Sequence, residues 1–153
     1  MALAAKDVLD RAGVESYVKT SGATGMHIFV PLGARYDFDQ AKDFSHALAE
    51  EIHYEIEDLT SLERSPKARR KLIYIDFLQN AIGQTIVAPY SLRPTPEATV
   101  SMPLKWSEVK KGLHPSQFTI KNALARIEKM GDLFEGVLGT GIDLKKAMDN
   151  LGA

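Results

Sequence analysis

The sequence contains no cysteine, almost no net charge and no long apolar run. The absence of cysteine excludes disulfide bonds and any zinc site with cysteine ligands. A formal net charge of −1 gives no overall attraction to polyanions, so a site for nucleic acid or phosphate requires a local basic cluster. No stretch is apolar for long enough to span a bilayer, and the first residues become charged too soon for a secretory signal. These absences predict a cytoplasmic protein that makes no membrane contact.

The remaining composition is that of an ordinary globular protein, with 44% hydrophobic and 25% charged residues. A chain of 153 residues is long enough to bury a substantial core. We therefore expect residues 1–153 to form a single domain.

Hydrophobic periodicity predicts helices combined with hairpins. Asp37 and Gln40 form a capping box ahead of an amphipathic stripe, and Asp143 is placed to cap a final helix. A five-residue loop with two glycines, 21–25, joins two short apolar strands as in a β-hairpin. This arrangement predicts an α+β fold with a largely antiparallel sheet and flanking helices. The first expected helix begins at residue 2 or 3 and ends at 12, and the others cover 37–52, 65–71, 122–130 and 144–151. The expected strands are 17–20, 26–31, 71–80, 85–88, 98–102 and 118–120.

The segment 71–80 is the apolar, β-branched run around which we expect the fold to be organised, as a strand buried on both faces. Asp76 interrupts this run. A carboxylate in such a strand must be hydrogen-bonded, neutralised or bound to a cation, because burying an unpaired charge is costly. The residue pattern alone leaves Asp76 as either a structural acceptor or a metal ligand.

The first hairpin offers two weak signals of a ligand site. His27 shares a strand face with Phe29, where a histidine is more often a hydrogen-bonded core residue than a ligand. Ser21 and the glycine loop could present a hydroxyl and backbone N–H groups to a phosphate. A simple turn explains the same glycines.

Basic residues gather ahead of the 71–80 run, where Lys67, Arg69, Arg70 and Lys71 form either a solvated surface or an anion clamp beside Asp76. Arg93 lies between a leucine and a proline and has less freedom than an ordinary surface arginine. The remaining acidic pair, 37 and 39, fits a helix cap better than a metal site.

Three motifs occur in order along the chain: KTSGATGMHIFVPL at 19–32, IYIDFLQN at 73–80 and APYSLR at 88–93. Together they resemble the later half of the polymerase domain of bacterial DNA ligase D, a member of the archaeo-eukaryotic primase superfamily. The resemblance extends from about the first helix to the last.

The resemblance implies a function in non-homologous end joining, with template-dependent and end-extending addition of ribo- or deoxyribonucleotides by two-metal phosphoryl transfer. Asp76 matches a catalytic, metal-binding carboxylate that would hold Mn²⁺ or Mg²⁺ together with a D-x-D pair on an earlier strand. Ser21 and His27 match a nucleotide-binding S-G-x-x-G-x-H motif. Arg69, Gln79 and Arg93 match further nucleotide or phosphate contacts.

The partners implied are nucleoside triphosphates and gapped or broken DNA ends with a 5′-phosphate. An N-terminal polymerase segment, a ligase domain or an end-binding repair protein would complete the assembly. The sequence departs from the family at Thr24 and Ile82, where basic residues are common, so phosphate contacts are expected to be weaker or differently shared.

The D-x-D pair is expected ahead of the first helix, where this sequence has only Met1 to Ala4. Two hypotheses follow. The chain is the C-terminal part of an end-joining polymerase and is active only with an N-terminal segment, or it is a catalytically inactive module that binds nucleotides or DNA ends.

Overall fold

The computed structural model describes residues 1–152, and its internal contacts group them into two compact units. Unit 1 contains Met1–Glu15, Leu32–Thr85 and the segment that begins at Gly141, and unit 2 contains Ser16–Pro31 and Ile86–Thr140. The predicted α+β class is confirmed, because the described residues include four α-helices and an antiparallel sheet.

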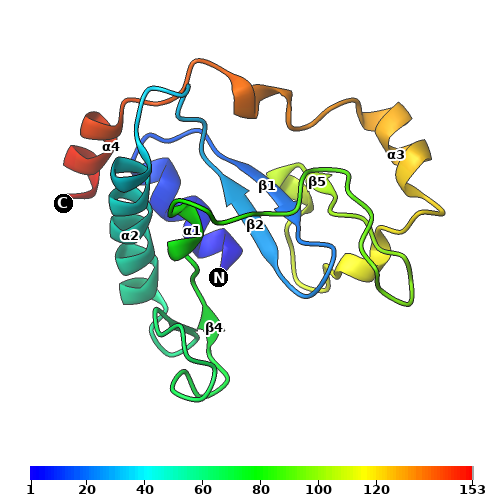
Figure 1. Ribbon diagram of the computed structural model, residues 1–153, viewed down its shortest axis with the longest axis horizontal. Helices are drawn as coiled ribbons and strands as arrows, with labels where there is room; N and C mark the ends of the chain where they lie inside the picture. Colours follow the sequence, from blue (N-terminus) through cyan, green and yellow to red (C-terminus); the bar gives the residue numbers. More distant parts are fainter. Residues whose placement is uncertain (153) are drawn as a thin grey trace. The chain divides into compact units, whose positions relative to one another are not determined.

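Unit 1 is built on helix α2 (Phe38–Glu55), which packs against α1 (Ala2–Arg11), α4 (Leu144–Leu151) and the 3₁₀ turn η1 (Leu78–Asn80) (Figure 1). The predicted capping box is present, with Gln40 N 2.8 Å from Asp37 Oδ1 and Asp37 N 3.0 Å from Gln40 Oε1. Phe44, Leu48 and Ile52 form the buried stripe. Burial of this face against α1 and α4 supplies the core of the unit.

Unit 2 contains a three-stranded antiparallel sheet with the order β2-β1-β5. Its strands are β1 (Tyr17–Thr20), β2 (Met26–Phe29) and β5 (Pro103–Leu104). The first hairpin has the predicted loop, and its register places Lys19 opposite His27. Helix α3 (Ala123–Met130) follows in the same unit, as predicted. Strand β1 is therefore the central strand of this sheet and is paired on both edges.

The predicted buried strand at 71–80 is wrong. Only β4 (Ile73–Tyr74) is a strand, and it pairs in parallel with β3 (Thr60–Ser61). β4 has one partner strand, so its other edge is unpaired, and the side-chain burial expected of a core strand is absent, since 47% of Ile73 is exposed. Asp76 is likewise exposed. The continuous apolar sequence at 71–80 predicted a buried strand, but the structure does not bury it.

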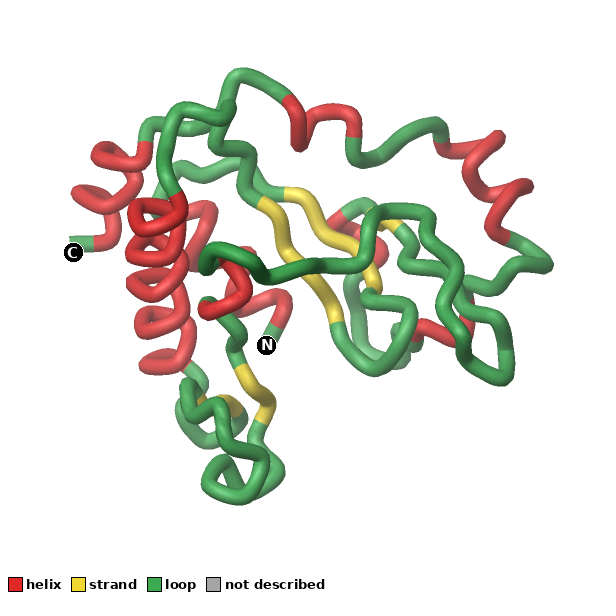
Figure 2. Tube along the Cα trace, in the orientation of Figure 1, coloured by secondary structure: helices red, strands yellow, loops and turns green. Residues whose placement is uncertain are grey.

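Two neighbouring predictions are also wrong. The helix expected at 65–71 is a series of turns, because Arg70 and Lys71 adopt left-handed φ angles of 49° and 72° that stop a right-handed helix. The segment 85–88, expected as a strand, is a loop. Figure 2 shows the chain between β4 and β5 almost entirely as loop, interrupted by η1. Among residues 1–152, no helix is long and apolar enough to cross a membrane.

Candidate functional site

A cluster of basic side chains lies on the hairpin of unit 2. Lys19 on β1 is completely buried, with no exposed surface, and its Nζ lies 3.0 Å from His27 Nδ1 on β2. The same Nζ donates a hydrogen bond of 2.6 Å to Ser101 Oγ. The ring of Phe29 lies 5.7 Å from Nζ. The hairpin thus holds an ammonium group next to a histidine ring.

The charges in this cluster act on one another. Burial, aided by the nearby Arg93 charge, lowers the pKa of Lys19 to about 8. Burial also lowers the pKa of His27 to about 4, with further contributions from Lys19 and Arg93. His27 is therefore neutral and Lys19 largely charged near pH 7. None of the ion pairs found among residues 1–152 includes Lys19 or Arg93.

The glycine loop is closed by the hydroxyl of Ser21. Its Oγ accepts hydrogen bonds of 3.1 Å from the backbone N–H groups of Ala23 and Gly25. These N–H groups therefore already donate hydrogen bonds within the turn. The Ser21 hydroxyl still has its own proton to donate, and this is the group that could contact a ligand oxygen.

Arg93 packs directly against this loop. A Cβ atom added at Gly22, whose φ is +71°, would lie 2.5 Å from Arg93 Cγ. The Arg93 backbone is held by a hydrogen bond from its N to Thr99 O of 2.7 Å, and its buried Nε has no partner among the described residues. The structure therefore brings three of the predicted residues together in unit 2, namely Ser21, His27 and Arg93.

A second group of predicted residues lies in unit 1. Burial and the nearby Asp76 carboxylate raise the pKa of Tyr74, and the guanidinium of Arg69 lies 5.1 Å from the centre of the Tyr74 ring. Tyr74 thus connects the exposed Asp76 with one member of the basic segment. The amide nitrogen of Gln79 donates a hydrogen bond to Thr85 O, which leaves its amide oxygen as the end available to a ligand.

Possible metal ligands do not gather around Asp76 in the part of the chain that is described. Residues 1–152 contain no group of three or more histidine or acidic side chains placed to hold a metal ion. Asp37 caps α2, and Asp39 forms an ion pair with Lys42 at 2.9 Å, in agreement with the capping interpretation. These residues alone do not fit a two-cation site.

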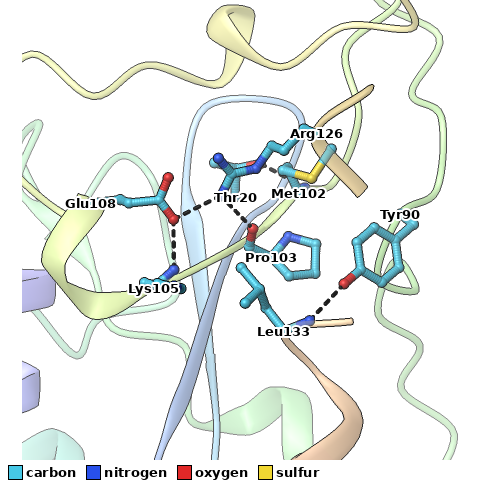
Figure 3. A network of polar contacts seen from close by, with 8 residues as sticks. All are labelled: Thr20, Tyr90, Met102, Pro103, Lys105, Glu108, Arg126 and Leu133. Atoms are coloured by element: carbon cyan, nitrogen blue, oxygen red, sulfur yellow. Dashed lines mark hydrogen bonds and ion pairs between the residues drawn. The ribbon is translucent and has the colours of Figure 1, made fainter. Parts of the chain in front are cut away.

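A network of polar contacts connects the segments around the sheet in unit 2 (Figure 3). Arg126 on α3 donates to Glu108 at 2.7 Å and to Pro103 O at 3.3 Å, and this guanidinium lowers the pKa of Glu108. Burial and a 2.7 Å hydrogen bond to Asp132 raise the pKa of Tyr90 to about 12. Tyr90 therefore keeps its proton at any working pH and serves as a fixed donor.

The low pKa of His27 predicts a measurable pH dependence of stability. Between pH 6.5 and about 4 the unfolded chain binds a proton on His27 that the folded chain does not, so the unfolding free energy falls as pH falls through this window. Urea unfolding at a series of pH values gives the number of protons taken up on unfolding, from the slope of the unfolding free energy against pH. In this pH window we expect that number to be smaller by about one for His27→Gln than for the parent. Equal slopes for the two proteins would contradict this prediction.

Lys19 is the member of the cluster to which sequence reasoning assigned no function. A signal was present, because a five-residue loop at 21–25 places Lys19 opposite His27 once strand pairing is assumed. The sequence did not indicate that Lys19 would be buried or that Ser101 would be its partner, since these two residues are 82 positions apart.

Comparison with known proteins gives one consistent family. A family model described as "LigD, primase-polymerase domain" matches residues 1–134. The bifunctional non-homologous end joining protein LigD of Bacillus subtilis is 38% identical over 127 residues, which are 82% of this chain and 21% of that protein. The multifunctional LigD of Pseudomonas aeruginosa is 30% identical over 143 residues, which are 92% of this chain and 17% of that protein.

A solved structure agrees in fold. The polymerase domain of Mycobacterium tuberculosis Ligase D, in complex with DNA, superimposes with a TM-score of 0.83 at 27% sequence identity. The match covers 92% of this chain and 49% of that one. The chain thus spans about half of the solved polymerase domain and about a fifth of the curated relatives.

Proposed function

Because the chain belongs to the LigD primase-polymerase domain family, we propose that it supplies the nucleotide-binding part of a nucleotidyltransferase that extends DNA ends in non-homologous end joining. In this proposal residues 1–153 correspond to the later part of the polymerase domain. The observation that carries the proposal is the cluster of Lys19, His27 and Arg93, whose cationic groups have no acidic partner among the ion pairs of residues 1–152.

Such a cluster is suited to a triphosphate. A polyphosphate brings several negative charges, and a guanidinium can bind two of its oxygens at once. In the proposed site Arg93 contacts phosphate oxygens, the Ser21 hydroxyl donates its free proton, and His27 donates from its ring. By the family resemblance, Arg69 and Gln79 are proposed separately, within unit 1, as phosphate or nucleotide contacts. The DNA partner is a gapped or broken end with a 5′-phosphate.

Asp76 is the carboxylate that the chain contributes to catalysis in this proposal. A cation pair of the kind the family implies, Mn²⁺ or Mg²⁺, needs more carboxylates than the neighbourhood of Asp76 offers in residues 1–152. A D-x-D segment from further polypeptide, or from another chain, would have to complete the site.

The small number of carboxylates near Asp76 favours a second candidate function. A chain with the phosphate-binding cluster and one exposed acid would bind nucleotides or DNA ends without chemistry. The two candidates share the cluster in unit 2 and differ only in whether nucleotides are added.

Two assays on the same preparation test the proposal. Titration calorimetry with ATP measures nucleotide binding, and we expect saturable binding by the chain. Primer extension on gapped, 5′-phosphorylated DNA with Mn²⁺ and ribonucleotides then measures addition, first with the chain alone and then with a D-x-D segment of a relative added. Binding with extension only in the second mixture supports the polymerase function, binding without extension in either supports the binding module, and no ATP binding overturns both.

A further inference from the structure

We propose that Lys19 is a positioning residue: its Nζ binds Nδ1 of His27 and so fixes the ring in the tautomer that presents Nε2–H to the nucleotide phosphates. This inference rests on the proposed nucleotide-binding function for its last step only. The tautomer itself is a property of the protein without ligand.

The position of Lys19 explains why it must act through another residue. Lys19 lies on the central strand of the sheet in unit 2, and none of its surface is exposed. A ligand in solution therefore cannot contact its ammonium group. His27, which lies opposite on β2, is partly exposed, and its ring carries the effect of Lys19 toward the surface.

Hydrogen-bond accounting fixes the direction of each contact. Ser101 Oγ donates its single proton to Thr20 O at 2.9 Å, so the same oxygen must accept at its 2.6 Å contact with Lys19 Nζ. An ammonium group has three donors and no acceptor. The 3.0 Å contact with His27 is therefore donated by Nζ, and Nδ1 of His27 carries no proton.

A neutral imidazole without a proton on Nδ1 carries it on Nε2. Among residues 1–152, no hydrogen bond to Nε2 of His27 is found. The buried atoms that lack a partner do not include this Nε2. Nε2–H is thus available as a donor to an anion. Without Lys19, the ring could place its proton on either nitrogen and would present an acceptor part of the time.

The surrounding charges keep the pair in this state near neutral pH. The groups facing it are Arg93 from the loop after residue 86, the ring of Phe29 and the hydroxyl of Ser101. With a pKa of about 4, His27 is neutral at pH 6 to 7, and with a pKa of about 8, Lys19 is then mostly protonated. Above pH 8 the deprotonated amine could accept from Nδ1–H, so the fixed tautomer is expected to be lost there.

A lysine kept only for packing would not produce this pattern. Its aliphatic stem could fill the same space, and a buried charge without an acidic partner is costly to maintain. An apolar side chain of similar length, methionine, would then serve equally well. The chemical state of His27 separates the two explanations.

The experiment is nitrogen-15 NMR of the histidine rings in the parent protein and in Lys19→Met, at pH 6.5 and at pH 9. We expect the parent at pH 6.5 to show His27 with a proton on Nε2 and none on Nδ1. Lys19→Met should show averaging between the tautomers and a higher pKa for His27, because a nearby positive charge is removed. The exposed Lys110 gives a matched control, since Lys110→Met makes the same chemical change away from the cluster.

Nucleotide binding then connects the tautomer to the function. Lys19→Met should weaken ATP binding about twofold, because a ring shared between two tautomers presents Nε2–H only about half of the time, and Lys19→Arg should restore part of it. Lys110→Met should bind like the parent.

Each possible outcome has a defined meaning. A parent spectrum with the proton on Nδ1, or with a charged ring at pH 6.5, overturns the inference even if Lys19→Met does not fold. An unchanged tautomer in a folded Lys19→Met overturns it as well. Failure of the parent to bind ATP, with the expected tautomer present, overturns the proposed function and leaves the assignment of Lys19 as the fixing residue intact.

Discussion

Replacing Asp76 by asparagine is expected to reduce primer extension to background in whichever mixture supports it, the chain alone or the chain with an added D-x-D segment. Asparagine keeps the shape of the side chain but removes the negative charge that the family pattern requires at this position. Fold stability should change by less than about 0.5 kcal/mol, because Asp76 is exposed. Primer extension and urea unfolding, measured on the same preparation, check both parts.

The matched control is Asp58→Asn, which removes an exposed carboxylate from the same unit. It should retain extension. Extension by Asp76→Asn at the level of Asp58→Asn would refute a catalytic function for Asp76. It would also strengthen the alternative interpretation of the residue as an acceptor near Tyr74.

Replacing Gly22 by alanine is expected to lower the unfolding free energy by about 3 kcal/mol. Two costs combine at this buried position. A left-handed φ of +71° costs a residue with a Cβ about 1–2 kcal/mol. The new Cβ would also lie 2.5 Å from Arg93 Cγ and 3.0 Å from the backbone N of Ser101, and the backbone atom cannot move without disturbing the neighbouring segment.

Gly83 provides a control that separates these costs. Its φ is +79°, but an added Cβ would meet nothing within 4 Å, so Gly83→Ala should cost only about 1 kcal/mol. Urea unfolding of the two variants measures the difference. Equal losses would mean that the close approach between the loop and Arg93 contributes nothing to stability.

The Gly22 substitution also bears on ligand binding. Because Arg93 packs on Gly22, any relief of the overlap must displace the guanidinium from the cluster with Lys19 and His27. We therefore expect folded Gly22→Ala to bind ATP more weakly than Gly83→Ala. This links the glycine of the loop to the proposed site through packing, since the N–H groups of the loop are already used by Ser21.

The sequence by itself determined the elements whose signals are local. The capping box of Asp37 and Gln40 set the start of α2, because a cap acts over three residues. The length of loop 21–25 set the hairpin and its register, and so placed Lys19 opposite His27. The three motifs also carried enough information to indicate the family that the comparisons then showed.

Tertiary structure alone decided what is buried and what the cluster contains. The apolar run at 71–80 looked like a core strand, yet burial depends on packing against other parts of the chain that the run itself does not encode, and Ile73 is exposed in the folded unit. Conversely, nothing in the sequence indicates that Lys19 is buried, yet it is fully buried, beside a strand and a serine that are distant in sequence. Local rules act over a few residues, whereas burial and the pKa shifts that follow from it depend on contacts between distant parts of the chain.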